Sequence, residues 1–572
     1  MARGMAEAWP ERERLFRAQM FCAALVEEYS RLECGRLQVD RLGSSCDTTR
    51  APVSTDQLNR GEIALAHALA EQLTRFDQAE ALYLVGTVYT VLLPKETRSR
   101  LGAYYTPPCL VERLLDQVTK LGFDWRQGSI LDPACGGGAF LAPIALRMAS
   151  ALEGAEPALI LSSISHRLRG YEIDSFAGWI SQALLEICLM PICIAARKRL
   201  PQMVMVVDSL AQASSDKFDL VVGNPPYGKV SLSVKQRNRY KRSLYGHANL
   251  YGLFTDFALR CLRDDGVLAY VTPTSFLGGQ YFKALRRLLL EESRPCSFEF
   301  VSDREGVFDD ALQETMLATY RKDGLVEPCR VFSISPRSLS RMDLVDLGSV
   351  NLPATGDQAW VMPREGRHKA MAARMSSMST RLSDLGYSVS TGQLVWNRHK
   401  LQLRMDKDGR RTYPLVWAEA VRAGSFSMQY SKANHLPYIE VPLGQEWLLM
   451  TRQCILCQRT TSKEQERRLI AAVLPRDLVG EGKGGVVVEN HLNMIIPEGG
   501  AKVSPATISA LLNSEAVDSA FRCISGSVAV SAYELNSLPL PSLDELVEIE
   551  GLVLGRASSR TIEATLHDIY GL

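Results

Sequence analysis

Residues 219–228 have the sequence DLVVGNPPYG, an apolar run that stops at a corner with two prolines. The apolar run predicts a buried strand. Pro225 and Pro226 fix φ and remove two backbone donors, so the corner is stiff and its carbonyls are free. Asn224 and Tyr227 then stand beside a bare backbone carbonyl. This set suits one task, which is to accept both hydrogens of a planar NH2 group while stacking on the ring that bears it.

The chain has 572 residues, of which 46% are hydrophobic and 23% are charged. This length and composition predict two or three domains, each with its own hydrophobic core. A formal net charge of +1 excludes a global attraction for DNA or membranes, so nucleic-acid binding would need local basic clusters. No apolar stretch has bilayer length, and residues 1–13 are charged rather than secretory in pattern. Thirteen scattered cysteines indicate reduced thiols. These features predict a cytoplasmic protein without a membrane partner.

The chain divides by pattern into five regions. Residues 1–98 predict helices, and residues 99–325 alternate short apolar strands with amphipathic helices, which favours the α/β class with a mostly parallel, doubly wound sheet. Prolines and glycines mark a connecting region over 326–380, residues 381–545 mix strand-like runs with many Arg, Trp and Tyr, and residues 546–572 predict helices. The expected strands of the α/β region are 128–131, 169–171, 203–207, 220–222, 267–272 and 299–301, and its helices include 110–121, 177–196, 252–262 and 280–292.

Polar or glycine-rich groups follow four successive predicted strands. The first strand ends in residues 132–140, DPACGGGAF, whose three glycines let a ligand approach the backbone and open a helix. This pattern is not the dinucleotide G-x-G-x-x-G, and no Gly-Lys-Ser/Thr follows, so a phosphate cradle is a poor fit. Glu172 follows the second strand, where an acid can accept from two ribose hydroxyls. Asp208 follows the third and suits an adenine amino group, and Asn224 follows the fourth.

In these motifs the chain resembles the DNA adenine-N6 methyltransferases of the gamma arrangement, similar to TaqI-type modification enzymes. The order of cofactor motifs, catalytic motif and recognition region is the gamma order, and the close resemblance spans residues 101–322. It implies a Rossmann-like methyltransferase domain over 99–325, an α+β DNA target-recognition domain over 381–545, and S-adenosylmethionine as the cofactor. The implied cofactor-binding residues are Tyr105, Thr106, Asp132, Ala134, Cys135, Gly136, Gly138, Phe140, Glu172, Asp208 and Asn224. The implied catalytic residues are Asn224, Pro225, Pro226 and Tyr227, with Tyr227 and Phe308 stacking on a flipped base.

Local basic clusters supply candidate DNA contacts. Residues 229–242 include six basic residues and no acid, so a loop there could neutralise phosphates beside the site. In the tail, Arg, Asn and Gln are side chains that read base edges. The candidates are Lys229, Lys235, Arg237, Arg239, Lys241, Arg242, Trp396, Asn397, Arg398, Arg452 and Arg459. Cys454 and Cys457 suggest zinc, but no second pair has zinc spacing and a strand would point their sulfurs to opposite faces, so no metal site is predicted.

The leading hypothesis is a site-specific enzyme that methylates N6 of a flipped adenine in double-stranded DNA. The resemblance implies the modification part of a prokaryotic, nucleoid-associated restriction–modification or phage-defence system, with a separate restriction endonuclease as candidate partner. One alternative is methylation of RNA or of protein glutamine, against which the long Arg- and aromatic-bearing tail argues. Another is the methylase half of a single-chain restriction–modification enzyme, but the first hundred residues contain no convincing Asp…Glu-x-Lys cluster. A DNA-binding module without activity is disfavoured by the intact motifs.

Overall fold

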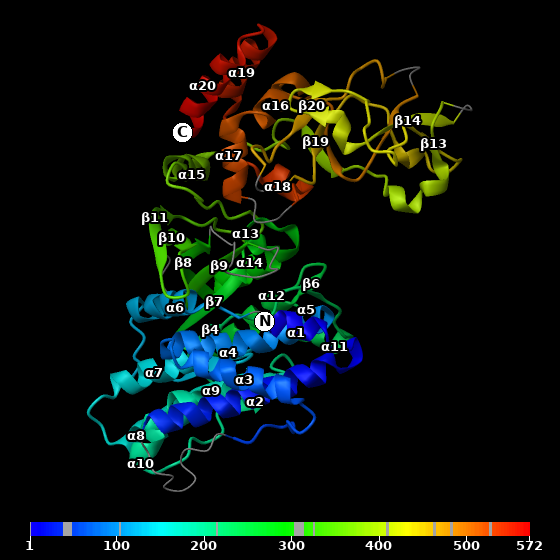
Figure 1. The fold of residues 1–572 in the computed structure, drawn as a ribbon. Coiled ribbons are helices and arrows are strands. Elements are labelled where there is room, and N and C mark those ends of the chain that lie inside the picture. The colour runs from blue at the N-terminus through cyan, green and yellow to red at the C-terminus, as the bar shows by residue number, and fades with distance from the viewer. Residues whose placement is uncertain are drawn as a thin grey trace. The chain divides into compact units, whose positions relative to one another are not determined.

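The computed structural model (Figure 1) describes residues 2–37, 49–101, 105–212, 216–301, 314–323, 327–407, 411–461, 465–480, 484–524 and 529–572. The chain divides into two compact units. The first comprises Met1–Pro273 and Ala284–Val345, and the second comprises Thr274–Lys283 and Asp346–Leu572. The helices at the N-terminus therefore share a unit with the α/β sheet.

Helices form the N-terminal part of the first unit, as the sequence predicts. They are α1 (Ala2–Glu7), α2 (Glu11–Arg36), α3 (Arg60–Leu73), α4 (Gln78–Leu92) and α5 (Lys95–Leu101). Asn59 and Glu62 form a reciprocal capping box at the start of α3, and Asp77 accepts from the backbone N–H of Glu80 at the start of α4. Apolar side chains of α1, α2, α3 and α4 form one buried cluster with those of α9 (Ser175–Cys188).

One mixed sheet is the centre of the first unit. Its strands are β1 (Ile130–Asp132), β2 (Leu168–Glu172), β3 (Val204–Val206), β4 (Phe218–Gly223), β7 (Leu262–Pro273), β8 (Ser293–Val301), β9 (Thr315–Lys322), β10 (Cys329–Pro336) and β11 (Met342–Val350). Their order is β11-β10-β8-β9-β7-β4-β1-β2-β3. β3, β2, β1, β4 and β7 pair in parallel, as do β8 and β10, whereas β9 runs antiparallel to β7 and β8. All six predicted strands are present, and the α/β class is confirmed.

The burial of both faces of β4 explains why its sequence is continuously apolar. Leu220 and Val222 belong to the cluster that holds Leu114 of α6. Val221 points to the other face and is equally inaccessible to solvent. Both faces of the strand are therefore covered, as parallel sheets require. The remaining helices of this unit are α6 (Pro108–Lys120), α7 (Leu141–Ala151), α8 (Pro157–Arg167), α10 (Met190–Ala196), α11 (Val234–Arg239), α12 (Leu250–Cys261) and α14 (Lys283–Glu292).

Two predicted segments differ from the structure. The helix expected over 177–196 is broken at Leu189 into α9 and α10, because Pro191 in the first turn of α10 cannot donate into a continuing helix. The connecting region expected over 326–380 contains β10, β11 and α15 (His368–Ser377), so its prolines separate elements instead of marking a linker. Within the described residues no single helix is long and apolar enough to span a bilayer, although the bent pair α9–α10 passes that test by length and composition.

The second unit has its own mixed core of small sheets and helices. Its larger sheets have the orders β12-β22-β19-β20 and β13-β17-β14-β21-β18. Cys454 and Cys457 belong to two different buried clusters, on opposite sides of β19, as period-two geometry predicts. The strands are β12 (Tyr387–Thr391), β13 (Leu403–Arg404), β14 (Thr412–Val416), β15 (Val421–Arg422), β16 (Ser425–Phe426), β17 (Tyr438–Glu440), β18 (Leu449–Met450), β19 (Ile455–Gln458), β20 (Ala471–Val473), β21 (Val486–Val488) and β22 (Leu492–Pro497). The helices after α15 are α16 (Pro505–Leu512), α17 (Glu515–Ile524), α18 (Ala532–Ser537), α19 (Leu543–Leu554) and α20 (Ser559–Tyr570).

Candidate active site

The Asn-Pro-Pro-Tyr corner follows β4 directly and is held by the side chain of Thr106 and by a backbone carbonyl of β7. The amide Nδ2 of Asn224 donates to Oγ1 of Thr106 at 3.1 Å. The hydroxyl of Tyr227 donates to Oδ1 of Asn224 at 2.6 Å and lies 3.2 Å from the backbone carbonyl of Val271 in β7. These contacts define which end of the amide is the acceptor. One lone pair of Oδ1 is used by Tyr227, and a second is left for another donor.

A glycine before the corner brings the ends of β4 and β1 together. Gly223 has φ +151°, and a Cβ at this position would lie 2.6 Å from Oδ1 of Asp132. A larger residue would therefore push apart the two strand ends that carry Asn224 and Asp132. Asp132 is 1% exposed, and burial raises the pKa of its carboxyl to about 8. Its Oδ1 accepts from the backbone N–H of Ala134 at 3.1 Å, which starts the glycine loop.

The glycine loop is tied to the acid after β2. The backbone N–H of Gly136 donates to Oε2 of Glu172 at 2.8 Å, and the N–H groups of Ile173 and Asp174 donate to Oε1 at 3.0 and 2.9 Å. Burial raises the pKa of Glu172, while these three donors act in the opposite direction. Glu172 is thus oriented by backbone groups, with its remaining acceptor capacity available to a ligand.

Most predicted cofactor residues line one cavity of about 500 Å³, a size typical of small-molecule sites. These are Tyr105, Thr106, Asp132, Ala134, Cys135, Gly136, Phe140, Glu172, Asp208 and Asn224. Asp208 is exposed, and its Oδ1 accepts from the backbone N–H of Leu210 at 3.0 Å. Gly138 supports the loop instead, because it has φ +89° and a Cβ there would lie 2.7 Å from Oγ of Ser181.

The cavity also includes residues that the motifs did not indicate. Tyr89 and Thr90 of α4, Ile173, and Phe254 of α12 contribute to its wall. Pro226, a predicted catalytic residue, also lines the cavity. Ile173 could have been found from the sequence, since an isolated apolar residue between two acids is unusual in a turn, and here it is 62% exposed. Phe308, the second predicted stacking residue, lies outside the described residues.

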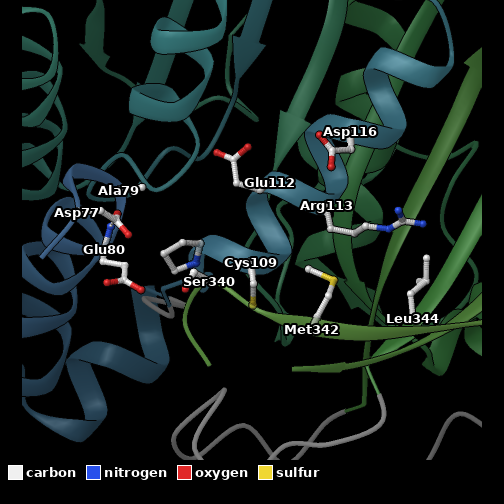
Figure 2. A pocket seen from close by; sticks show the side chains of 11 residues that line it. Asp77, Ala79, Glu80, Cys109, Glu112, Arg113, Asp116, Ser340, Met342 and Leu344 are labelled. Carbon is white, nitrogen blue, oxygen red and sulfur yellow. Dashed lines mark hydrogen bonds between the residues drawn. The ribbon is translucent and has the colours of Figure 1, made fainter. Parts of the chain in front are cut away.

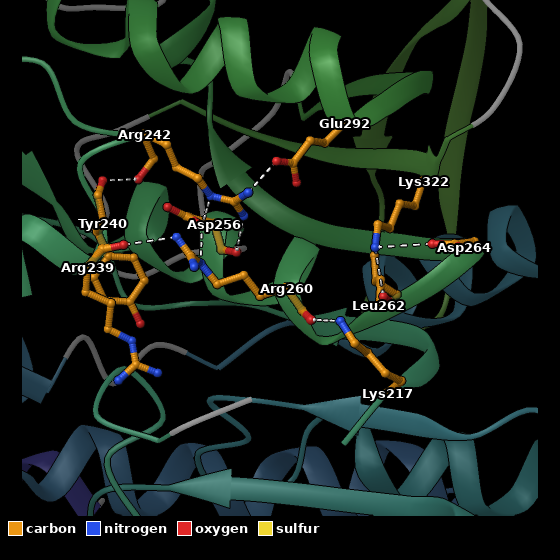
Figure 3. A network of polar contacts seen from close by, with 11 residues as sticks. Lys217, Arg239, Tyr240, Arg242, Asp256, Arg260, Leu262, Asp264, Glu292 and Lys322 are labelled. Atoms are coloured by element: carbon orange, nitrogen blue, oxygen red, sulfur yellow. Dashed lines mark hydrogen bonds and ion pairs between the residues drawn. The ribbon is translucent and has the colours of Figure 1, made fainter. Parts of the chain in front are cut away.

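Some basic side chains of the stretch after the corner are exposed, and others form contacts within the protein. Arg242 donates to Asp256, at 2.7 Å, and to Glu292, and Asp256 is fully buried (Figure 3). Arg239 donates to the backbone carbonyls of Ala211 and Gln212. The charge of Arg242 therefore compensates a buried carboxylate. Its contact with phosphate stays a prediction.

The other basic residues of this stretch are accessible. The strand β5 (Lys229–Val230), which pairs with β6 (Ala248–Asn249), begins with the exposed Lys229. Helix α11 presents the exposed Lys235 and Arg237, and Lys241 after this helix is also exposed. Arg237 donates to the backbone carbonyl of Gly246 at 3.2 Å. Their contact with DNA stays a prediction.

In the second unit the predicted DNA-contacting residues are partly engaged. Trp396 packs edge-on against Trp417 with ring centroids 6.0 Å apart, whereas Asn397 and Arg398 beside it are exposed. Arg452 is 58% exposed and lies 3.5 Å from Glu498. Arg459 donates to the backbone carbonyl of Asn490 at 3.2 Å. The contact of these residues with DNA stays a prediction.

A second cavity of about 340 Å³ in the first unit contains none of the predicted site residues (Figure 2). Arg113 in its wall forms a 2.7 Å ion pair with the buried Glu299. Glu112 and Asp116 both contact Arg147. Arg113, Glu112 and Asp116 thus form ion pairs with residues of other elements.

Similarity to known proteins agrees with this arrangement. Residues 194–308 match the family described as Eco57I restriction-modification methylase. The chain is 26% identical over 384 residues to type II methyltransferase M.BsuBI of Bacillus subtilis, covering 66% of this chain and 72% of that protein. It is also 26% identical over 359 residues to type II methyltransferase M.PstI of Providencia stuartii, covering 60% and 69%.

Among solved structures, the fold is similar to that of the Type IIL restriction-modification enzyme MmeI in complex with DNA. The TM-score is 0.53 at 14% identity, over 97% of this chain and 87% of that one. At this identity the likeness establishes the shared fold.

Proposed function

We propose, from the premise that residues 194–308 form an Eco57I-type restriction-modification methylase domain, that the protein transfers a methyl group from S-adenosylmethionine to N6 of adenine in double-stranded DNA. Methylation of DNA within a restriction–modification system is the activity class of the relatives. The adenine target, the cofactor and the residue roles are our proposal. The observation that carries it is the placement of Asn224, held by Thr106 and Tyr227, at the wall of the glycine-loop cavity.

The cavity fits a nucleoside with a charged amino-acid tail. Glu172, fixed by three backbone donors, presents carboxylate oxygens suited to ribose hydroxyls. Ile173 and Phe254 supply apolar surface for a purine, and Asp208 supplies an acceptor for an exocyclic amine. Tyr105 adds a buried hydroxyl for which the described residues provide no hydrogen-bond partner. An orphaned donor at such a wall is expected where a ligand normally completes the site.

The corner supports chemistry at an amino group. When bound, S-adenosylmethionine would supply an electrophilic methyl group. Asn224 would accept a hydrogen bond from one N6–H at the free lone pair of Oδ1, and the carbonyl of Pro225 would accept a hydrogen bond from the other. The nitrogen would then gain tetrahedral character and point its lone pair at the methyl carbon. Transfer would exchange the S–C bond for an N–C bond, and the one surplus N6 proton would leave to solvent. Positioning and electrostatics carry the rate.

Access to this corner requires the base to leave the duplex. Tyr227 keeps its ring beside the amide because its hydroxyl is anchored to Asn224 and to the carbonyl of Val271. We assign Tyr227 as the stacking surface for the flipped base, with Phe308 as its predicted counterpart. Specificity for a DNA sequence would come from the second unit, where Asn397 and Arg398 are exposed.

The test is transfer of labelled methyl groups to unmethylated genomic DNA, followed by single-molecule mapping of modified bases. We expect N6-methyladenine in one short motif for the wild type, and loss of transfer by at least ~100-fold in Asn224→Ala at saturating cofactor, which is necessary because Asn224 also lines the cavity. RNA and protein offered in competition should not be labelled. Full activity of Asn224→Ala would exclude the proposed chemistry, and labelling of RNA or protein alone would exclude DNA as the substrate.

A further inference from the structure

Helix α4 of the N-terminal region forms part of the cofactor cavity. Tyr89 and Thr90 of this helix line the same cavity as Glu172 and Asp208. Both residues lie outside the matched segment 194–308 and outside the motifs recognised in the sequence. The N-terminal helices therefore contact the site even though the sequence assigns them no role.

A chain of hydrogen bonds connects α4 to the predicted ribose-binding acid. The hydroxyl of Tyr89, which is 3% exposed, donates to Oδ2 of Asp174 at 2.9 Å. Oδ1 of Asp174 accepts from the backbone N–H of Phe176 at 2.9 Å and so caps α9. The backbone N–H of Asp174 in turn donates to Oε1 of Glu172. Tyr89 thus restrains the turn that orients Glu172.

A second contact connects α4 to the glycine loop through a tyrosine ring. A Cβ on Gly86 of α4 would lie 2.0 Å from the ring of Tyr105, and a Cβ on Gly137 would lie 1.3 Å from its hydroxyl oxygen. Only glycine on both sides leaves space for this ring. Tyr105 is therefore clamped between α4 and the loop, and neither can shift without releasing it.

Burial supports a permanent rather than a transient contact. The apolar faces of α2, α3 and α4 share one cluster with Phe176, Trp179 and Ile180 of α9. The ring of Tyr89 lies 5.0 Å from that of Phe176, centroid to centroid. The helices and the cavity wall consequently form one packed body, in which ordering of one part favours ordering of the other.

We propose that the N-terminal helices are a structural wall of the cofactor site, with Tyr89 as the positioning residue that orients Asp174 and Glu172, so that cofactor binding and packing of α4 stabilise each other. The inference rests on the proposed cofactor and adds to it a role for residues 1–98. Linkage requires that a ligand in the cavity protects the amides of α4 from hydrogen exchange, and that loosening α4 weakens ligand binding by the same factor.

The experiment measures the Kd of S-adenosylhomocysteine for the full chain by isothermal titration calorimetry, together with hydrogen exchange of α4. Tyr89→Phe removes the hydroxyl and keeps the ring, and we expect a Kd about tenfold weaker, or ~1.4 kcal/mol. Gly86→Ala should also weaken binding, although alanine favours the helix itself, because it displaces the Tyr105 ring. Tyr29→Phe is the matched control, since Tyr29 is buried in the same cluster without lining the cavity, and its Kd should not change.

The outcomes separate this inference from the proposed function. Increased protection of α4 amides by the ligand, with weaker binding in Tyr89→Phe but not in Tyr29→Phe, supports the linkage. Wild-type Kd in Tyr89→Phe with unchanged exchange in α4 overturns it while leaving the methyltransferase proposal intact. Absence of binding to the wild type overturns both, because then the cavity does not hold this cofactor.

Discussion

Replacement of Thr106 by valine tests how the catalytic amide is oriented. Oγ1 of Thr106 accepts from Nδ2 of Asn224 at 3.1 Å, and Thr106 is 2% exposed. Valine keeps the shape and removes the acceptor, so the amide hydrogen of Asn224 faces a buried methyl group instead of a hydrogen-bond partner. Such a loss costs about 2 kcal/mol, and the amide can then rotate to present its NH2 group where Oδ1 should be. That energy corresponds to a rate about 30-fold lower.

The assay is single-turnover transfer of a labelled methyl group to a duplex containing the target adenine, with cofactor at saturation. Saturation is necessary because Thr106 also lines the cavity, so the Kd of S-adenosylhomocysteine is measured separately. Thr106→Ser keeps the acceptor oxygen and should transfer within about threefold of the wild type. If Thr106→Val transfers at the wild-type rate under saturation, Thr106 does not orient Asn224 and the reasoning is refuted.

Three further predictions concern charge. Lys229→Ala combined with Lys235→Ala should reduce the slope of log K against log salt for duplex binding by about 1.8. Arg242→Ala should leave the slope unchanged, because Arg242 is paired with Asp256. Equal slopes for all variants would contradict the distinction between exposed and paired basic residues. Asp256→Ala should lower the free energy of unfolding by about 3 kcal/mol in urea titrations, since it removes the buried carboxylate that pairs with both Arg242 and Arg260; an unchanged midpoint would exclude this role. Burial lowers the pKa of His368 below its usual 6.5, so the unfolded chain binds this proton first as pH falls, and stability should decrease below about pH 6.5. In thermal melts, His368→Gln should show a smaller loss of stability over this pH range. An identical pH dependence in the variant and the wild type would count against this role.

The local sequence was sufficient to predict the ends of the parallel strands and most of the residues that line the cavity. Asp132, Glu172 and Asn224 follow apolar runs, and because parallel strands end at one edge their side chains had to converge there. The break at Pro191 shows the limit of periodicity, since apolar spacing continued through a residue that stops the helix. Strands β10 and β11 were missed because their sheet neighbours are set by pairing that no local pattern specifies.

Basic residues were the least predictable part of the candidate site. Arg242 and Lys235 have the same charge and lie seven positions apart, yet Arg242 pairs with Asp256 and Glu292 while Lys235 is exposed. The two residues differ because folding brings Asp256 and Glu292, from later parts of the chain, next to Arg242. A charge count therefore overestimates the surface available to phosphate.

By itself, the sequence determined what covalent geometry and short-range patterning control. This includes the stiff corner at Pro225 and Pro226, the glycines that permit close approach, and the apolar strands whose ends carry acids. Only the tertiary structure decided that Tyr89 lines the cavity and donates to Asp174, that Thr106 accepts from Asn224, and that Arg242 compensates a buried acid. These are contacts between residues 14 to 118 positions apart, and such pairs form only when packing of the whole unit overcomes the entropy of closing the chain between them.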